Sequence, residues 1–356
     1  MSDKVPTMHD VAREAGVSTA TVSRVLNGGR VRPDTARRVR GAMRRLGYVP
    51  NRVARGLVTG RTDVVGVLVP DLVGPLNAAV ARGVEDALEA RGMHAVVMTD
   101  HRDAERERDR LETLVARRVD GFVLIGSELP DEEIARLVGA IPVVHVGAES
   151  ERDRLPEVRV DNTAGIDAVL TLLTAAGHGR VAHLRGSRRD GRERLAALRE
   201  RAPAHGLELT TVVDADFSEE GGLRAGRTLL AQGGFDAVLC ANDRSAVGLY
   251  AAVRERGLRI PEDLSIVGFD DLPWSGYLAP PLTTLRQPSR EMGRLAAERI
   301  LEPAGAGAWH GVRALAPDLV ARASTARAPP ADLRADRRDS DEGPPPHAPT
   351  SKEVEA

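Results

Sequence analysis

The sequence predicts a small all-α head followed by an α/β core with two doubly wound parallel sheets. Two observations predict this architecture. Residues 7–46 place apolar side chains at helical spacing in three short segments. Residues 63–326 instead alternate β-branched apolar runs with amphipathic stretches, and this alternation restarts near residue 180. Such alternation is typical of parallel sheets that are covered by helices on both faces.

The head begins with two short helices joined by a tight turn. Thr7 is placed to cap the first helix, with Asp10 three residues later in a capping-box arrangement. Gly16 follows this helix at a position where left-handed backbone is favoured, and Ser18 caps the second helix. The inward positions of the second helix are Val22, Val25 and Leu26, and the outward ones are Thr19, Ala20, Ser23 and Arg24.

A two-helix unit with an arginine on the free face of its second helix has the outline of a helix-turn-helix reader of the DNA major groove. The alternative is a helical hairpin with a solvated basic face. Two neighbouring features favour the first interpretation: a third helix is predicted at 33–46, with Pro33 at its first position, and the segment 47–60 follows it. The charge is also uneven. Residues 1–60 hold twelve Lys or Arg and four Asp or Glu, in a chain of formal net charge −2. A basic head on an acidic body indicates a nucleic-acid partner.

The core is predicted strand by strand from its apolar runs. The expected strands are 64–69, 95–99, 121–125 and 143–146 in the first series, and 180–184, 211–213, 237–240 and 264–268 in the second. Helices are expected at 76–91 and 104–117 between strands of the first series. Ligands of such folds bind beyond the carboxyl ends of the strands.

Several classes of protein are disfavoured by what the sequence lacks. The one cysteine, Cys240, rules out an internal disulfide and fits a reducing cytoplasm. There is no apolar run of eighteen residues, and the N-terminus is polar and then basic, so we expect no membrane span and no signal peptide. P-loop, HExxH, paired CxxC and G-x-S-x-G motifs are all absent. We therefore expect no catalytic residues, no metal and no cofactor.

Longer motifs identify a family. Residues 10–27 (DVAREAGVSTATVSRVLN) and 47–60 (GYVPNRVARGLVTG) resemble the DNA-binding head of the lactose-repressor/galactose-repressor family. The resemblance covers roughly residues 5–325. It continues in order through GVLVPD (66–71), RRVDGFVL (117–124), IPVVHV (141–146), VDNTAG (160–165), GHGRVAHL (177–184), AND (241–243), PEDLSIVGFDD (261–271), PPLTTLRQP (280–288) and PDLVARAST (317–325).

The resemblance implies a periplasmic-binding-protein-like core, with a ligand between two subdomains and chain crossings near 161, 288 and 317. The tail is Pro-rich, charged and without apolar period, so we expect it to be disordered. The predicted parts are a head at 1–50, a hinge helix and linker at 51–62, a core N-subdomain at 63–161 and 289–316, a core C-subdomain at 162–288 and 317–326, and the tail at 327–356.

DNA recognition is expected from two elements. Thr19 and Ala20 are small enough to touch a thymine methyl, and Arg24 can pair with guanine or a phosphate; the resemblance implies that the first two set operator choice. It also implies that 51–57 is a hinge helix that folds in the minor groove, with Leu57 wedged between base steps; a plain linker is the alternative. The expected DNA-binding residues are Thr7, Ser18, Thr19, Ala20, Thr21, Ser23, Arg24, Asn27, Tyr48, Asn51, Arg52, Ala54, Arg55 and Leu57.

The expected effector site departs from the family pattern. An aromatic pair usual after the first strand is replaced by DLVGPLN at 71–77. Arg194 matches the family's effector-binding arginine, but the Gly and aromatic residue that usually follow it are absent, and Trp274 is a candidate replacement stacking face. Carboxylates, an amide and a guanidinium suit the hydroxyls of a sugar. The expected effector-binding residues are Asp71, Leu76, Asn77, Asp161, Arg194, Asn242, Asp270 and Trp274.

The sequence thus predicts a homodimeric transcriptional regulator, expected to be a repressor of a pseudo-palindromic operator in double-stranded DNA, gated by a small polar effector such as a sugar. A purine or nucleoside effector remains an alternative. A solute-binding protein is a weaker one, because it should carry an export signal and no DNA-binding head. The sequence leaves open whether the effector induces or corepresses.

Overall fold

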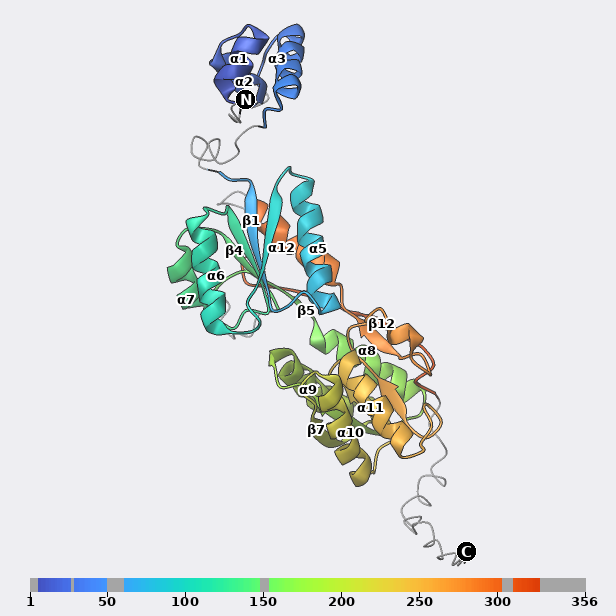
Figure 1. Cartoon of the computed structure of the whole chain (residues 1–356). Helices are drawn as coiled ribbons and strands as arrows, with labels where there is room; N and C mark the ends of the chain where they lie inside the picture. The colour runs from blue at the N-terminus through green and yellow to red at the C-terminus, as the bar shows by residue number, and fades with distance from the viewer. Residues whose placement is uncertain (1–5, 27–28, 50–60, 148–153, 303–309, 327–356) are drawn as a thin grey trace, which may run out of the picture. The chain divides into compact units, whose positions relative to one another are not determined.

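A computed structural model describes residues 6–26, 29–49, 61–147, 154–302 and 310–326. They belong to two compact units (Figure 1). One unit covers the chain up to Val64 together with Arg118–Asp120, and the other, the core, covers the rest. The name head is used below for residues 6–49 of the first unit. Asn27, the expected hinge helix and the tail at 327–356 lie outside the described residues.

The head consists of the helices α1 (Met8–Ala15), α2 (Thr19–Leu26) and α3 (Pro33–Leu46). The predicted capping box is confirmed, because Asp10 N donates to Thr7 Oγ1 and Thr7 N donates to Asp10 Oδ2. Gly16 has the predicted left-handed backbone, with φ of 62°. The three helices bury a small common core made of Val11, Ala12, Ala15, Val22, Val39 and Ala42.

The first half of the core, here called the N-subdomain, contains a six-stranded sheet of order β11-β5-β4-β3-β1-β2. The pairs β1–β3, β3–β4, β4–β5 and β5–β11 are parallel. Its strands are β1 (Val64–Val69), β2 (His94–Thr99), β3 (Gly121–Ile125), β4 (Val143–Val146), β5 (Glu157–Val160) and β11 (Val312–Leu315).

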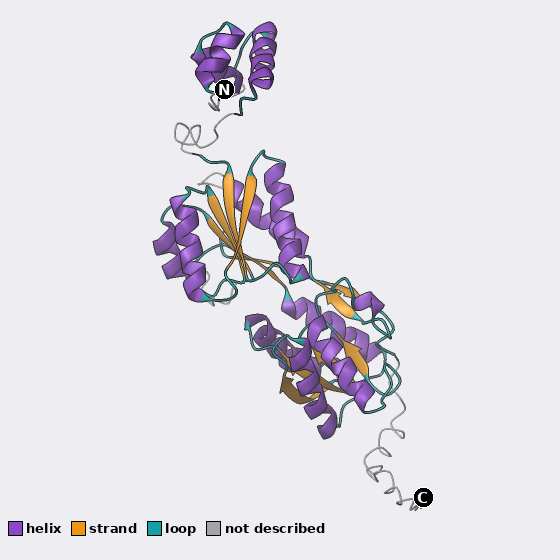
Figure 2. Cartoon of the chain, in the orientation of Figure 1, coloured by secondary structure: helices purple, strands orange, loops and turns teal. Residues whose placement is uncertain are grey.

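Four helices cover this sheet (Figures 1 and 2). They are α5 (Pro75–Glu89) and α12 (Ser289–Leu301) on one face, and α6 (Ala104–Ala116) and α7 (Asp131–Val138) on the other. Because β3 and nearly all of β1 are buried, these strands are continuous apolar runs, as strands covered on both faces require.

The helices α5 and α12 approach each other closely through two glycines. A Cβ atom on Gly293 would lie 2.0 Å from the carbonyl oxygen of Val80, and one on Gly83 would lie 2.0 Å from that of Arg290. No side chain larger than hydrogen fits at either position without moving a backbone. This packing fixes the start of α12 against the middle of α5.

The second half, the C-subdomain, contains a parallel four-stranded sheet of order β7-β6-β8-β9. Its strands are β6 (Arg180–Arg185), β7 (Glu208–Asp214), β8 (Ala237–Cys240) and β9 (Ser265–Val267). Its helices are α8 (Asn162–Ala175), α9 (Arg189–Arg201), α10 (Glu219–Gln232) and α11 (Asp243–Glu255), with the short 3₁₀ helices η1 (Ala202–His205) and η2 (Ser275–Tyr277).

The chain passes between the two subdomains three times. It runs from β5 into α8, from β10 (Thr284–Arg286) into α12, and from β11 into β12 (Asp318–Val320), which pairs antiparallel with β10. The predicted fold class, a small all-α head and an α/β core of two parallel-sheet subdomains, is confirmed. No helix among the described residues is long and apolar enough to cross a membrane.

The eight predicted strands are all present, whereas β5, β10, β11 and β12 were not predicted. Among the predicted strands, the largest difference in length is at β7. It spans Glu208–Asp214, whereas the sequence predicted only 211–213. β7 is an edge strand whose inner residues are half-buried. It therefore has no continuous apolar run to mark its length.

Candidate nucleic-acid interface and ligand cleft

The outward face of α2 carries the residues expected to read bases. Val22 is buried in the head, whereas Ala20 and Arg24 are exposed and Thr19 and Ser23 are half-buried. Small and polar side chains on an accessible helix face suit contact with base edges in the major groove. The structure thus places these expected residues on one accessible helix face of the head.

Other expected DNA-contacting residues also have structural partners within the head. Ser18 Oγ accepts a hydrogen bond from Thr21 N at 3.2 Å and lies 3.0 Å from Thr21 Oγ1. Thr7 belongs to the capping box, and Tyr48 packs half-buried against the core of the head. The hydroxyl groups of Thr7 and Ser18 therefore also hold the starts of α1 and α2. Asn27, Asn51, Arg52, Ala54, Arg55 and Leu57 lie outside the described residues.

Arg38 of α3 holds the turn before α2. Its Nε donates to the carbonyl oxygen of Ala15 at 3.1 Å, and its Nη2 donates to those of Ala15 and Gly16 at 2.7 and 3.0 Å. These carbonyls close α1 and begin the turn, so Arg38 fixes the direction in which α2 leaves it. Sequence reasoning missed this residue, because one arginine in an Arg-rich helix gives no local signal.

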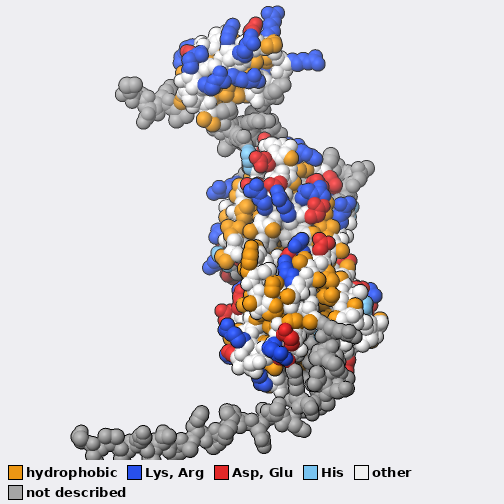
Figure 3. All heavy atoms as spheres, turned by 90° about the vertical axis from the view of Figure 1, so that its right-hand side faces the viewer, with side chains coloured by type: hydrophobic (Ala, Val, Ile, Leu, Met, Phe, Trp, Pro, Cys, Tyr) orange, Lys and Arg blue, Asp and Glu red, His pale blue; other side chains and the backbone are white. Residues whose placement is uncertain are grey.

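The head is strongly basic. Its described residues hold nine arginines, all exposed, and three acidic residues, each of which pairs with an arginine. Figure 3 shows Lys and Arg side chains spread over the surface of the head. The excess positive charge suits a polyanion such as the DNA backbone.

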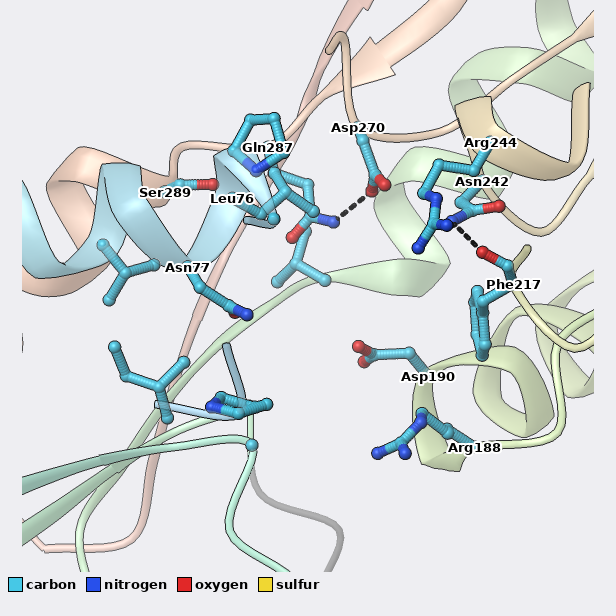
Figure 4. Close-up of a pocket in the computed structure, with 18 of the residues that line it drawn as sticks. Leu76, Asn77, Arg188, Asp190, Phe217, Asn242, Arg244, Asp270, Gln287 and Ser289 are labelled. Carbon is cyan, nitrogen blue, oxygen red and sulfur yellow. Dashed lines mark hydrogen bonds between the residues drawn. The ribbon is translucent and has the colours of Figure 1, made fainter. Parts of the chain in front are cut away.

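A cleft of about 440 Å³ lies between the two core subdomains (Figure 4). Its walls follow the carboxyl ends of β1, β3 and β4 on one side and of β6, β7, β8 and β9 on the other. This is where doubly wound folds bind ligands. The volume is within the range of small-molecule sites, roughly 300–1,000 Å³.

Six of the eight expected effector residues line this cleft: Asp71, Leu76, Asn77, Arg194, Asn242 and Asp270. Asp161 does not, because its carboxylate caps α8 by accepting a hydrogen bond from Ala164 N at 2.9 Å. It lines a separate hollow of about 270 Å³. Trp274 is also outside the cleft lining, at the start of η2. The structure therefore does not bring Asp161 and Trp274 together with the other six expected residues.

Sequence reasoning missed several residues that line the cleft. They are Arg188, Asp190, Phe217, Arg244, Gln287 and Ser289. Phe217 follows β7 and supplies the aromatic face that the sequence had suggested for Trp274. In Figure 4 the side chain of Asp190 extends toward the middle of the cleft, on the same side as Asn242 and Asp270. The signal available was position: these residues follow strand ends or lie at a crossing between subdomains.

Arg194 is held rigidly in the wall of the cleft. Its side chain is 2% exposed, its Nε donates to Asn162 Oδ1 at 2.9 Å, and its Nη1 donates to the carbonyl oxygen of Ala241. The guanidinium stacks on the ring of Phe269, 3.4 Å from its centroid. Neither hydrogen-bonding partner is a charged group, so the positive charge remains to act on the cleft.

Asp270 is the most perturbed acid of the cleft. Burial raises its pKa to about 8, with an opposing effect from Arg194 and a further increase from Asp243. Its Oδ1 accepts a hydrogen bond from Gln287 Nε2 at 2.6 Å. Its φ of 127° is rare for a residue with a side chain, and such strain is typical of binding sites.

Asp243 fixes the loop that carries Asp270. It is fully buried and accepts hydrogen bonds from Leu272 N at 2.9 Å, from Ser275 Oγ at 2.5 Å and from Thr284 Oγ1 at 2.5 Å. Burial raises the pKa of this carboxyl to about 6. Asp243 thereby ties α11, the loop after β9 and the crossing strand β10 together. Within the described parts of the chain, no group of His, Cys, Asp and Glu has a metal-binding arrangement.

A helix-turn-helix head joined to a two-subdomain core with a polar cleft defines a class: DNA-binding regulators with a ligand-binding core. The comparisons with known proteins agree. A family model described as bacterial regulatory proteins, lacI family, matches residues 7–51, and one described as a periplasmic binding protein-like domain matches residues 170–325.

The ribose operon repressor of Escherichia coli is 34% identical over 309 residues, which cover 83% of this chain and 94% of that protein. The transcriptional regulator CelR of Thermobifida fusca is 37% identical over 313 residues, 83% of this chain and 92% of CelR. A structure of a CelR–cellobiose complex matches with a TM-score of 0.66 and 33% identity, covering 90% and 99% of the two chains.

A crystal structure of the Lac repressor dimer bound to operator matches with a TM-score of 0.83 and 29% identity, over 91% of this chain and 100% of that chain. The chain belongs to the lacI family of bacterial regulatory proteins, and it is a DNA-binding transcriptional regulator. The family predicted from the sequence is confirmed. The relatives compared here are regulators of transcription rather than enzymes.

Proposed function

We propose that this chain is a cytoplasmic, dimeric repressor whose affinity for a pseudo-palindromic operator is gated by a small carbohydrate in the cleft. The observation that carries the proposal is the pairing of a basic helix-turn-helix head with a cleft lined by carboxylates and amides. The solved Lac repressor is a dimer on its operator, and CelR was solved with cellobiose. Both descriptions support the proposal by analogy within the family.

The chemistry of the cleft supports a ligand rich in hydroxyl groups. Asp190, Asp270, Asn242 and Gln287 present oxygens and amide groups, which can each bind a hydroxyl as donor or acceptor. The ring of Phe217 offers an apolar surface for the C–H face of a sugar ring. We propose Asp71, Leu76, Asn77, Arg194, Asn242 and Asp270, together with Asp190 and Phe217, as effector-binding residues.

The DNA side of the proposal rests on α2 and on the segment beyond the head. We propose that Thr19, Ala20 and Arg24 read bases and that 51–57 acts as the hinge helix. Reading requires base-edge contacts, whereas phosphate contacts only position the protein. A bound effector would change the spacing of the two heads by binding one core arrangement better than the other.

Thermal-shift measurements with ribose, cellobiose and adenosine test the effector class directly, followed by calorimetry on any compound that raises the melting temperature. Asp190→Asn is expected to weaken the binding of a stabilising sugar by tenfold or more, since a buried polar contact is worth about 1–3 kcal/mol. Asp214→Asn is the matched control, because this exposed residue pairs with Arg185 outside the cleft. Stabilisation by adenosine alone would reject the sugar and retain the regulator.

Operator binding is tested by fluorescence anisotropy with and without that ligand. We expect the affinity of the full chain for operator to change when the sugar is added, and the affinity of Asp190→Asn to respond less. An operator affinity that is indifferent to a sugar that demonstrably binds would reject the gating.

A further inference from the structure

The start of α9 is joined to the N-subdomain by charged side chains. α9 belongs to the C-subdomain, and its partners lie on β5 and in the loop that follows β3. Among the described residues, ion pairs join Arg188 Nη1 to Glu128 Oε1 at 2.8 Å, Arg189 Nη1 to Glu157 Oε2 at 3.3 Å, and Arg159 Nη1 to Glu193 Oε1 at 3.5 Å. Each pair therefore crosses the boundary between the subdomains.

These pairs lie at different distances from the chain crossings. Glu157 and Arg159 are on β5, the strand that leads into the crossing at Asp161. Glu128 follows β3, which is two strands away in the order β5-β4-β3 and hence about 10 Å farther across the sheet. In Figure 4, Arg188 lies on the side of the cleft opposite Gln287, which is itself at a crossing. The Arg188–Glu128 pair therefore spans the mouth of the cleft.

Both partners of this pair are fixed in place. Glu107 of α6 is 1% exposed and accepts hydrogen bonds from Ser127 Oγ at 2.5 Å and from Glu128 N at 3.0 Å, which holds the loop that presents Glu128. Arg188 immediately precedes α9 as its N-terminal capping position. A pair with ordered backbones loses less conformational entropy than one between two free side chains.

We propose that the Glu128–Arg188 ion pair is a latch that holds the mouth of the cleft closed. When the subdomains rotate apart about the chain crossings, the two sides of the cleft mouth move apart the most. The Glu128–Arg188 contact therefore breaks, whereas the ion pairs on β5 persist. The inference rests on the proposed function only for the statement that the cleft is the effector site. Glu128 is not among the residues that line the cleft, so a change there does not remove a ligand contact.

Pulsed electron spin resonance distances between the subdomains test the latch without any ligand. Spin labels at Ala135→Cys in α7 and Ala196→Cys in α9 are both at exposed positions, and Cys240 is 3% exposed and escapes labelling. The labelled full chain is diluted with an excess of unlabelled chain, so that distances are measured within one chain. We expect Glu128→Gln to raise the ratio of open to closed populations by about twofold to fivefold, the range of an exposed ion pair.

Distance measurements on the same variant at high salt distinguish the loss of the latch from a general loosening of the core. Salt is expected to open the wild-type cleft more than that of Glu128→Gln, because the variant has already lost one of the screened interactions. Arg188→Gln should also open the cleft, and adding Glu128→Gln to it should cause less further opening than Glu128→Gln causes alone.

Glu255→Gln is the matched control. It removes a pair of similar length, Arg227 Nη2 to Glu255 Oε1 at 2.7 Å, that lies between α10 and α11 within the C-subdomain. Its distances should equal those of the wild type. The latch is refuted if Glu128→Gln and the wild type give the same distribution, or if Glu255→Gln opens the cleft equally. Failure of every sugar to bind would reject the proposed function without changing these distances.

Discussion

Replacing Gly293 with alanine is expected to destabilise the N-subdomain and disturb one wall of the cleft. The new Cβ would lie 2.0 Å from Val80 O, 2.9 Å from Val80 C and 3.0 Å from Val84 N. All three are backbone atoms of α5, so no side-chain rotation relieves the contact. The two helices must therefore separate by more than about 1 Å to restore ordinary van der Waals distances.

The size of the effect follows from two opposing contributions. Overpacking a tight contact costs about 1–3 kcal/mol, and rigid backbone neighbours place this site at the upper end. Alanine in place of glycine within a helix stabilises the folded state by about 1 kcal/mol. We expect a net loss of about 2 kcal/mol in the free energy of unfolding, or a melting temperature lower by about 4–8 °C for a core of this size.

Thermal denaturation of the full chain, followed by circular dichroism, measures this change. Ser289 and Asn77 lie near the starts of the two displaced helices and line the cleft, so the affinity for a stabilising sugar should fall as well. Gly41→Ala is the control, because its Cβ would meet only the end of the Arg45 side chain at 3.4 Å. A Gly293→Ala protein that melts at or above the wild-type temperature would refute the packing argument.

The other predictions concern the cleft, the segment after the head, and the head. Burial raises the pKa of Asp270 to about 8, so its neutral form stabilises the fold at low pH, and that contribution is lost as the pH rises through about 8. The melting temperature of Asp270→Asn should therefore fall less between pH 7 and pH 9 than that of the wild type. An equal fall of the two melting temperatures would contradict the assignment. Leu57→Ala should weaken operator binding by about 1–3 kcal/mol, as expected for a lost wedge contact, and leave binding to random DNA nearly unchanged in anisotropy titrations; equal losses on both would make 51–57 a plain linker. Arg38→Met removes three hydrogen bonds to carbonyl groups and should lower operator affinity by severalfold without changing sugar binding in calorimetry. An unchanged operator affinity would show that the turn needs no support from α3.

The strands whose bounds were predicted to the residue are those buried on both faces. The predicted ranges for β1, β3, β4 and β8 coincide with the structure, because a strand packed between two helical layers must be a continuous apolar run. β7 lies at the edge of its sheet and alternates less clearly, so its full length was not visible. The capping box at Thr7 and the stop at Gly16 were predictable because their chemistry is local.

The cleft was predictable only where a motif identified the residue. Arg194 and Asp270 lie in segments with a recognisable pattern, whereas Asp190 in the first turn of α9 and Phe217 in the loop after β7 lie in segments that carry none. These segments meet because the carboxyl ends of parallel strands lie along one edge of a sheet. Asp161 shows the limit of that rule, because it follows a strand directly and yet caps the next helix.

The position of Trp274 has a specific cause. The carboxylate of Asp243 accepts hydrogen bonds from Leu272 N and Ser275 Oγ and so draws the loop after β9 back onto α11. Trp274 lies between these two residues and is not among the residues that line the cleft, whereas Asp270 and Leu272 are. The aromatic face therefore comes from Phe217 after β7 instead.

This arrangement makes the two walls of the cleft unequal. The C-subdomain contributes most of the charged lining, including Asp190, Arg194 and Asp270, whereas the N-subdomain contributes Asp71, the amide of Asn77 and Arg102. A ligand held mainly by one wall stabilises closure only through its fewer contacts with the other. In such a cleft, a direct contact between the walls therefore has a larger influence on the fraction of molecules that are closed. The Glu128–Arg188 pair is placed to provide this contact.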